Sequence, residues 1–155
     1  MLSRFHRRLS YLILGLLLIS GIVHFVLHDY FPANGPFGPS PNPLEPWMLR
    51  LHGAAAMLTL LLVGSLLPTH VVRLWTFAPG NRRPGGALLL VTALLVVSGY
   101  GLYYFGGEHL RAWCRQAHLL LGLGAVPVFA LHVLLGRATR HSRVPPIPGA
   151  RRRPA

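Results

Sequence analysis

The chain has 155 residues, enough for one domain, of which 52% are hydrophobic and only 12% are charged. Soluble proteins carry about 25% charged residues, so this composition excludes an ordinary soluble domain and indicates a membrane protein. The formal net charge of +12 would suit a nucleic-acid partner, but its uneven distribution along the chain predicts no nucleic-acid binding.

Four apolar stretches follow one another along the chain and predict helices at about residues 9–28, 47–77, 86–105 and 113–136. Each is close to the roughly 20 residues that a helix needs to cross a bilayer. In lipid only helices or closed barrels satisfy their backbone groups, and segments of this length indicate helices. We therefore expect an all-α, integral membrane four-helix bundle over residues 1–140. The first stretch lacks a small-x-small cleavage site, so we interpret it as a retained helix rather than a signal peptide.

The segments between the predicted helices differ in character. The first loop, Asp29–Pro46, contains six prolines and should be stiff and extended, either as a spacer or as a docking surface for an outer partner. The second, 78–85, holds two Pro-Gly turn signals. The third, 106–112, is short, so the last two helices should be antiparallel neighbours. The tail 141–155 is rich in arginine and proline and is expected to be disordered or lipid-bound.

All 15 basic residues are arginines, and 12 of them lie at the N-terminus, in the second loop or in the tail. With four spans these regions share one side of the membrane. All three acids lie on the other side, together with Arg50, Arg111 and Arg115. The positive-inside rule then predicts both termini in the cytoplasm, with the basic face of the protein against anionic lipid.

Two of the predicted helices each carry a pair of histidines. His52 and His70 are 18 positions apart, which is about 27 Å and five whole turns of a helix. His118 and His132 are 14 positions apart, about 21 Å and roughly 40° short of four turns. Both helices run inward, so one histidine per helix lies at an outer level and one at an inner level. Ionisable residues inside a membrane are costly, and by default they indicate a functional site.

Two facing imidazoles complete the axial positions of a haem iron, whereas zinc needs three or four protein ligands. The sequence therefore predicts two haem b groups, one between His52 and His118 and one between His70 and His132. Glycines lie near three of these ligands, and they leave room for a porphyrin or for close helix packing. The inner pair fits less well, because His70 is about 6 Å too deep. Helix tilt or a kink at Pro68 or Pro127 would absorb this; alternatively, His6 is the fourth ligand.

A short repeat links the two halves of the chain. The first predicted helix contains Leu-Leu-Leu-Ile-Ser20-Gly21, and the third contains Leu-Leu-Val-Val-Ser98-Gly99. Each is followed by a helix whose first histidine comes just after an arginine. This pattern suggests two parallel two-helix units, although apolar helices resemble one another by composition alone.

The stretch His118-x3-Gly122-x9-His132 resembles the bacterial four-helix b-type cytochromes, a family that includes the cytochrome b561 group and the membrane subunits of formate dehydrogenase and hydrogenase. His52 matches that family's partner ligand for the outer haem. Several members take the other inner ligand from the first helix, where this chain offers His24 near the outer end and His6 outside the predicted span. If His70 substitutes, the ligand plan resembles the two-helix plan of quinol–cytochrome c reductase cytochrome b.

The resemblance also implies a quinol site near one haem, where a histidine or carboxylate accepts the proton released on oxidation. His24, His28 and Asp29 are the candidates at the outer end of the first helix, either as this site or as interfacial residues. The arginines near the ligands are candidate partners of haem propionates or plain charged caps; they are Arg50, Arg115, Arg73 and Arg137. The lone Cys114 is expected to be a packing residue.

The favoured function is a diheme cytochrome that relays electrons across the inner membrane, between quinone and a periplasmic-side or membrane redox protein. The chemistry is the cofactor's, so the chain would be an electron-transfer subunit, including one of a quinol-linked oxidoreductase. Two alternatives remain open: a membrane metal-binding or transport protein that uses the same histidines without haem, and an anchor subunit whose histidines merely pack.

Overall fold

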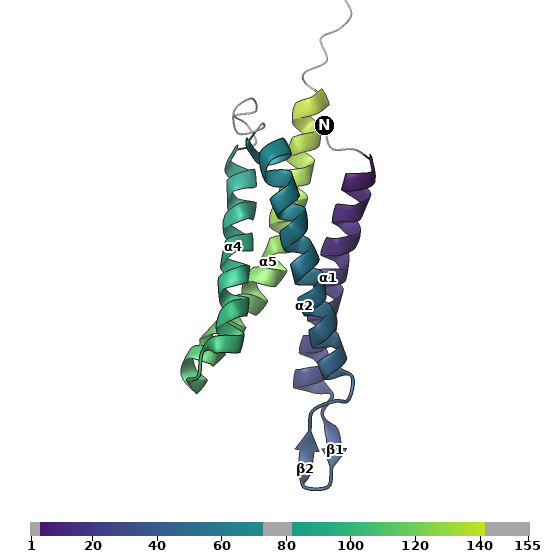
Figure 1. The fold of residues 1–155 in the computed structure, drawn as a ribbon, viewed down its shortest axis with the longest axis vertical. Coiled ribbons are helices and arrows are strands. Elements are labelled where there is room, and N and C mark those ends of the chain that lie inside the picture. The colour runs from purple at the N-terminus through teal and green to yellow at the C-terminus, as the bar shows by residue number, and fades with distance from the viewer. Residues whose placement is uncertain (1–3, 73–81, 142–155) are drawn as a thin grey trace, which may run out of the picture. The chain divides into compact units, whose positions relative to one another are not determined.

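A computed structural model describes residues 4–72 and 82–141, with side chains to residue 138 (Figure 1). The helices are α1 Arg4–Tyr30, α2 Glu45–Leu66 with its continuation η1 Leu67–Val72, α4 Arg82–Tyr104 and α5 Glu108–His141. Within the described ranges, four helices are long and apolar enough to cross a membrane. The all-α prediction is therefore confirmed, and the four candidate spans suggest a multi-pass membrane protein.

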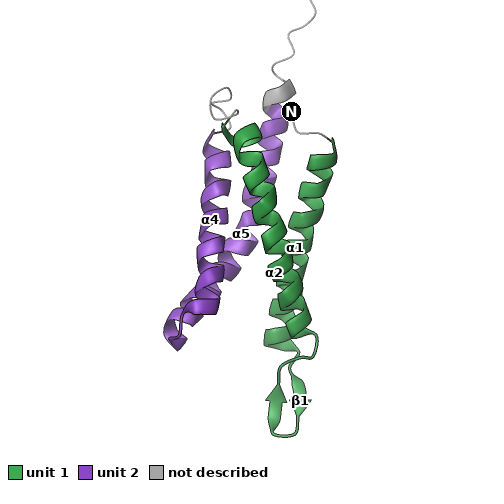
Figure 2. Ribbon diagram, in the orientation of Figure 1, with its two compact units in different colours: residues 1–73 green, residues 74–155 purple. Residues whose placement is uncertain are grey.

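The chain divides into two compact units, residues 1–73 and 74–155 (Figure 2). Unit 1 is the helix pair α1 and α2, and unit 2 is the helix pair α4 and α5. The helices of each pair run antiparallel, because a loop joins them at one end. The prediction that the last two helices are antiparallel neighbours is confirmed.

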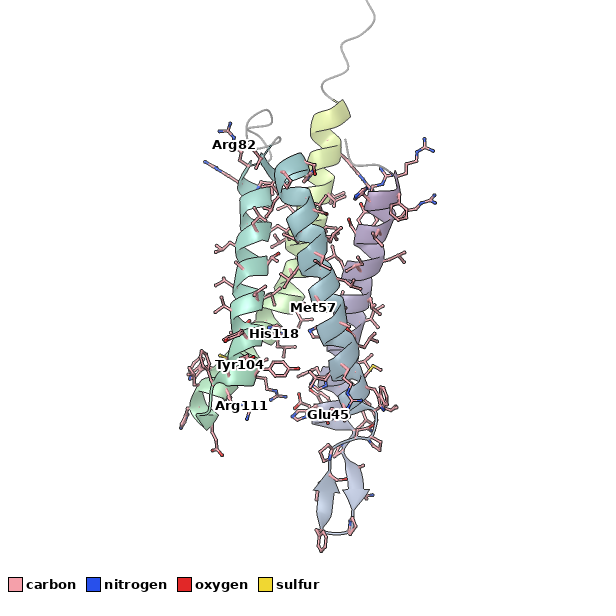
Figure 3. The ribbon with its side chains drawn as sticks, in the orientation of Figure 1. Glu45, Met57, Arg82, Tyr104, Arg111 and His118 are labelled. Atoms are coloured by element: carbon pink, nitrogen blue, oxygen red, sulfur yellow. The ribbon has the colours of Figure 1, made fainter. Side chains whose placement is uncertain are left out.

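Small side chains form the contact within each helix pair. In unit 1, Ser20 is 1% exposed and Ala55 is fully buried, and in unit 2 the buried positions include Ser98 and Gly101. Small residues allow helix backbones to approach closely, which is how helices associate where lipid offers no hydrophobic driving force. The large apolar side chains instead project outward from both pairs (Figure 3). An apolar exterior of this extent suits contact with lipid.

The helices extend beyond the predicted bounds at several ends. Helix α1 begins at Arg4, so His6, which lies before the predicted span, is part of the first turns of this helix. Helix α5 runs from Glu108 to His141 and continues through Pro127. Arginine is a good helix former whose apolar stem can lie along the membrane while its charge reaches water. A helix can therefore continue past its apolar stretch, which alone set the predicted limits.

The proline-rich loop is not simply extended, because it folds back as a hairpin of β1 Ala33–Gly35 and β2 Gly38–Ser40. The strands are antiparallel, with Ala33 opposite Ser40 and Gly35 opposite Gly38. Pro36 suits the first central position of the turn, and Gly38 has φ 116°, a conformation that favours glycine. Proline is tolerated in such short edge strands because its missing N–H need not face a partner strand.

Helix α2 changes its winding near its end. From Leu67 to Val72 the segment η1 is a π-helix, which contains Pro68 and His70. The ring of a proline crowds the carbonyl group four residues earlier in an α-helix, and a π-helical turn gives the ring of Pro68 more room. The prediction of five whole turns between His52 and His70 assumed a regular α-helix. The π-helical segment turns less per residue, so that assumption is wrong at His70.

The remaining expectations about chain ends and linkers fall outside the described residues. These are the course of the second helix to residue 77, the loop that follows it and the tail after residue 141.

Candidate functional site

In unit 1, the ring of His52 is held by groups on the neighbouring helix. Its Nδ1 lies 3.0 Å from the backbone oxygen of Leu17 and 3.3 Å from Oγ of Ser20. A carbonyl oxygen only accepts hydrogen bonds, so Nδ1 must carry the proton. In the neutral ring Nε2 is then the nitrogen with a lone pair for a metal, which is the tautomer that second-shell contacts commonly impose on metal-binding histidines.

In unit 2, His118 on α5, which is labelled in Figure 3, has a matching contact to Ser98 on α4. Its Nδ1 lies 3.0 Å from Oγ of Ser98. The hydroxyl of Ser98 donates to the backbone oxygen of Leu94 at 2.8 Å, and a hydroxyl has only one proton to give. Ser98 therefore accepts from His118, which again assigns the proton to Nδ1 and the lone pair to Nε2.

A glycine next to each serine lets the histidine ring approach the helix. A Cβ added at Gly21 would lie 2.8 Å from Cε1 of His52, and one added at Gly99 would lie 3.3 Å from Cε1 of His118. Both distances are shorter than an ordinary contact, so a side chain at either position would press on the ring. The repeated Ser-Gly pair thus has one physical role in both units. Sequence reasoning noticed the repeat but did not assign Ser20 or Ser98 a function.

The predicted inner-level histidines are half-buried within their own units. His70 lies in η1 and His132 lies on α5. A Cβ added at Gly85 would lie 3.6 Å from Cε1 of His132, so His132 also faces a glycine on α4. His6 lies on α1 and is exposed. Both inner-ligand candidates of unit 1 are therefore on described helices.

A second cluster lies at the end of unit 1 that carries the hairpin. Nδ1 of His28 is 2.7 Å from Oε1 of Glu45, and the rings of His24 and His28 stack with centroids 6.0 Å apart. The predicted partner Asp29 is exposed, and the carboxylate beside His28 is that of Glu45. Sequence adjacency pointed to Asp29, whereas the intervening hairpin returns the chain and brings Glu45 back to α1.

The loop is closed beside this cluster by Asn42. Its side-chain nitrogen donates to the backbone oxygen of Phe31 at 2.9 Å, and its side-chain oxygen accepts from the backbone N–H of Leu44 at 3.0 Å. These bonds hold the start of α2 near the end of α1. They leave an open pocket of about 190 Å³ lined by His28, Glu45, Asn42, Ser40 and three prolines.

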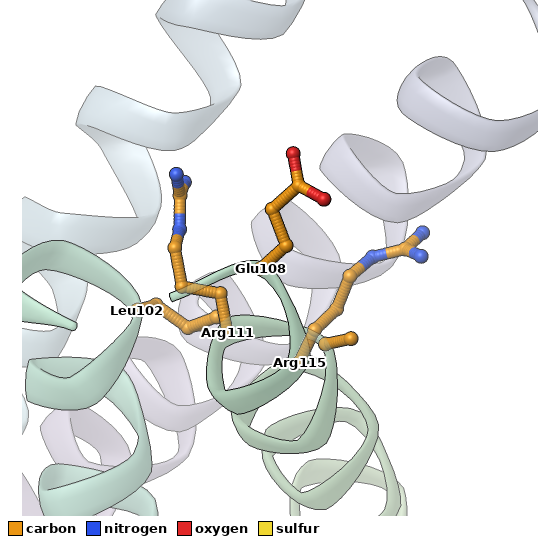
Figure 4. A pocket seen from close by; sticks show the side chains of 5 residues that line it. Leu102, Glu108, Arg111 and Arg115 are labelled. Carbon is orange, nitrogen blue, oxygen red and sulfur yellow. The ribbon is translucent and has the colours of Figure 1, made fainter. Parts of the chain in front are cut away.

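The predicted propionate partners have separate surroundings. Arg50 lies over the ring of Trp47, 4.9 Å from its centroid, a cation–π contact. Arg115 lines an open pocket of about 260 Å³ with Leu102, Glu108, Arg111 and Ala112 (Figure 4). Arg111 and Arg115 are four residues apart, so they lie on one face of α5. Arg137 is exposed on α5, and Arg73 lies outside the described residues.

Cys114 has the environment expected of a packing residue, because its Sγ lies 2.9 Å from the position of a Cβ added at Gly101. Among the residues that the structure describes, no group of three or more His, Cys, Asp or Glu side chains is arranged to hold a metal ion. A bis-histidine haem needs only two such ligands.

Comparison with known proteins adds no assignment. No protein-family model, no curated protein and no solved structure matches this chain.

Proposed function

We propose that this protein is a diheme b-type cytochrome that relays electrons across the bacterial inner membrane. The observation that supports this most directly is the matched state of His52 and His118. Each has its Nδ1 proton held by the neighbouring helix of its own unit, and each faces a glycine. An imidazole with Nδ1 protonated and Nε2 basic is the form that binds haem iron.

In this proposal the outer haem has one axial ligand from each unit, His52 and His118. Haem supplies reversible one-electron transfer, and the protein supplies the axial ligands, their hydrogen bonds and an apolar surrounding that excludes water. The arginines two and three positions before these histidines can pair with propionate carboxylates through charge-assisted hydrogen bonds. At this level they are Arg50 and Arg115.

The inner haem is assigned to His132 with His70, and Arg137 and Arg73 are the neighbouring basic residues. Fewer contacts support this ligand pair than support the outer pair. His132 faces Gly85 as His118 faces Gly99, whereas His70 lies in a π-helical segment. His6 is the alternative ligand, since it lies on the helix that pairs with α2.

The proposed electron donor is a quinol that binds at the outer end of unit 1. Oxidation of a quinol releases protons as well as electrons, so the site needs a proton acceptor next to an electron acceptor. His28 and Glu45 are hydrogen-bonded to each other in an open pocket, and His24 stacks on His28. The electrons would continue through the haems to a redox protein on the periplasmic side or in the membrane.

The arginine distribution supports the orientation, with both termini in the cytoplasm and the acidic residues outside. Anionic headgroups of the inner leaflet would neutralise the basic ends.

The test is a dithionite-reduced minus air-oxidised visible spectrum of detergent-purified protein expressed with ample haem, with haem quantified per chain. A sharp low-spin b-type signal at two haems per chain is expected. One haem per chain would retain the outer site and remove the inner one. Absence of haem would overturn the proposal and favour metal binding or a structural role for the histidines.

A further inference from the structure

We propose that the open pocket at the junction of α4 and α5 binds the headgroup of a phosphoethanolamine lipid. The phosphate would lie on two arginines and the ammonium group on a glutamate. The pocket has a volume of about 260 Å³ and is lined by Arg111, Arg115, Glu108, Leu102 and Ala112 (Figure 4). All of these residues belong to unit 2, and the inference does not depend on haem.

The two arginines supply the part of the pocket that binds an anion. Arg111 and Arg115 are four positions apart on α5, so they lie on one face of the helix. A guanidinium group presents its N–H donors in a planar fork that matches the oxygens of a phosphate. Arg111 is exposed and forms no ion pair with a described residue. A guanidinium group has several donors, so Arg115 can contact a phosphate beside any other partner.

Glu108 gives the pocket a charge of the opposite sign. Its side chain is exposed in the first turn of α5 and shares the pocket with both arginines. A bare phosphate ion would be repelled by this carboxylate, whereas a ligand with an ammonium group next to its phosphate would place an N–H donor there. The pattern of charges therefore fits a zwitterionic headgroup better than a free phosphate ion.

Exposed aromatic side chains indicate that the pocket lies at the depth of lipid headgroups. Tyr103, Tyr104 and Trp113 are 72%, 68% and 73% exposed, and they lie at the end of α4 and in the second turn of α5. Tyrosine and tryptophan concentrate where a membrane meets water, and both helices are long and apolar enough to cross a membrane. Leu102 and Ala112 add an apolar wall for the part of the lipid next to its headgroup. These features favour a lipid over a soluble phosphate compound.

The experiment is native mass spectrometry of the full-length protein in a non-ionic detergent, titrated with phosphatidylethanolamine or phosphatidylcholine of the same acyl chains. Both lipids carry a phosphate and a positive charge, but the choline nitrogen has no N–H to donate to Glu108. We expect the first phosphatidylethanolamine to bind more tightly by up to about fivefold, the range of an exposed ion pair. Equal affinity for the two lipids would overturn the inference. Displacement of the lipid by millimolar inorganic phosphate would also overturn it, because the ligand would then be a free phosphate ion.

The variants separate the two parts of the headgroup. Arg111→Gln should weaken the binding of both lipids, because both carry the phosphate, and Glu108→Gln should remove the difference between them. Arg83→Gln removes the same charge from an exposed position at the other end of α4 and should change neither affinity. Far-UV circular dichroism checks that each variant remains helical.

Three results with these variants would overturn the inference. They are unchanged affinities in Arg111→Gln, an intact lipid preference in Glu108→Gln, and an equal loss of affinity in Arg83→Gln, which would indicate diffuse attraction to arginine. A wild-type protein that shows the expected lipid pattern but contains no haem would overturn the proposed function alone.

Discussion

The two helix pairs share one arrangement and differ in what surrounds it. In both, a buried serine accepts a hydrogen bond from Nδ1 of a histidine on the partner helix, and the next residue is a glycine against the ring. Unit 1 also has a histidine–glutamate pair and a π-helical end. Unit 2 has an uninterrupted α5 and an arginine-lined pocket.

This comparison separates two kinds of role. A feature present in both units is what either needs to hold an imidazole in a fixed tautomer and orientation, which the proposed ligation of haem requires. A feature present in one unit alone points to an asymmetric task. The His28–Glu45 pair is such a feature, and it makes unit 1 the proposed site of quinol oxidation.

The strongest test of the shared arrangement is removal of either outer histidine. His52→Ala and His118→Ala should each reduce the haem content from two per chain to one, and both should abolish the same spectral component, because a bis-histidine iron needs both ligands. Haem per chain and low-temperature difference spectra measure this. His109→Ala, at an exposed position in the first turn of α5, serves as the control and should retain both haems. Loss of different components in the two variants would contradict a shared haem.

Removal of the inner-level histidines tests which residue of each unit binds the second haem. His132→Ala and His70→Ala are each expected to lose the second haem, with the outer spectrum unchanged. His6→Ala provides the comparison and should retain both haems. If instead His6→Ala loses one haem and His70→Ala loses none, the unit 1 ligand of the inner haem is His6 on α1. His70 in the π-helical segment would then not be a ligand.

The acidic residues at the start of α2 and α5 provide a matched pair. Glu45→Gln should slow haem reduction by a soluble quinol by about 10²-fold, the usual contribution of a positioned proton acceptor. Glu108→Gln, at the equivalent place in unit 2, and Asp29→Asn should have little effect. Stopped-flow absorbance measures the rates. Because the His28 side chain is 50% exposed, loss of the pair should change the free energy of unfolding by at most about 1 kcal/mol. If Asp29→Asn slowed haem reduction and Glu45→Gln did not, the proton acceptor would be Asp29, the carboxylate predicted from the sequence.

The smallest expected difference concerns the two glycines. Gly21→Ala places a Cβ 2.8 Å from the His52 ring, and Gly99→Ala places one 3.3 Å from the His118 ring. Overpacking of this kind costs about 1–3 kcal/mol, and Gly21→Ala should lie at the upper end. Thermal unfolding followed by circular dichroism measures it. Gly15→Ala has no atom within 4 Å of the new Cβ and should be neutral; a Gly99→Ala protein less stable than Gly21→Ala would reverse the comparison.

Much of this molecule follows from local patterns in the sequence. The apolar runs predict helices of membrane length, because hydrophobic length and backbone satisfaction in lipid depend on residues near one another in the chain. The short third loop predicted the antiparallel pair α4 and α5 for the same reason. The sequence shows that Ser20 and Ser98 belong to a short repeat. Their hydrogen bonds to histidines 32 and 20 positions away depend on helix packing, which the repeat does not predict.

The sequence by itself therefore determined the helical class, the helices long and apolar enough to cross a membrane, and the histidines that are candidate ligands. The tertiary structure decided which groups meet across each helix pair. It brought Glu45 to His28, 17 positions away, because the hairpin reverses the chain. It engaged His52 with the Leu17 carbonyl, a group that every residue possesses and no sequence pattern distinguishes. It also displaced His70 from regular spacing, because the segment Leu67–Val72 is π-helical rather than α-helical.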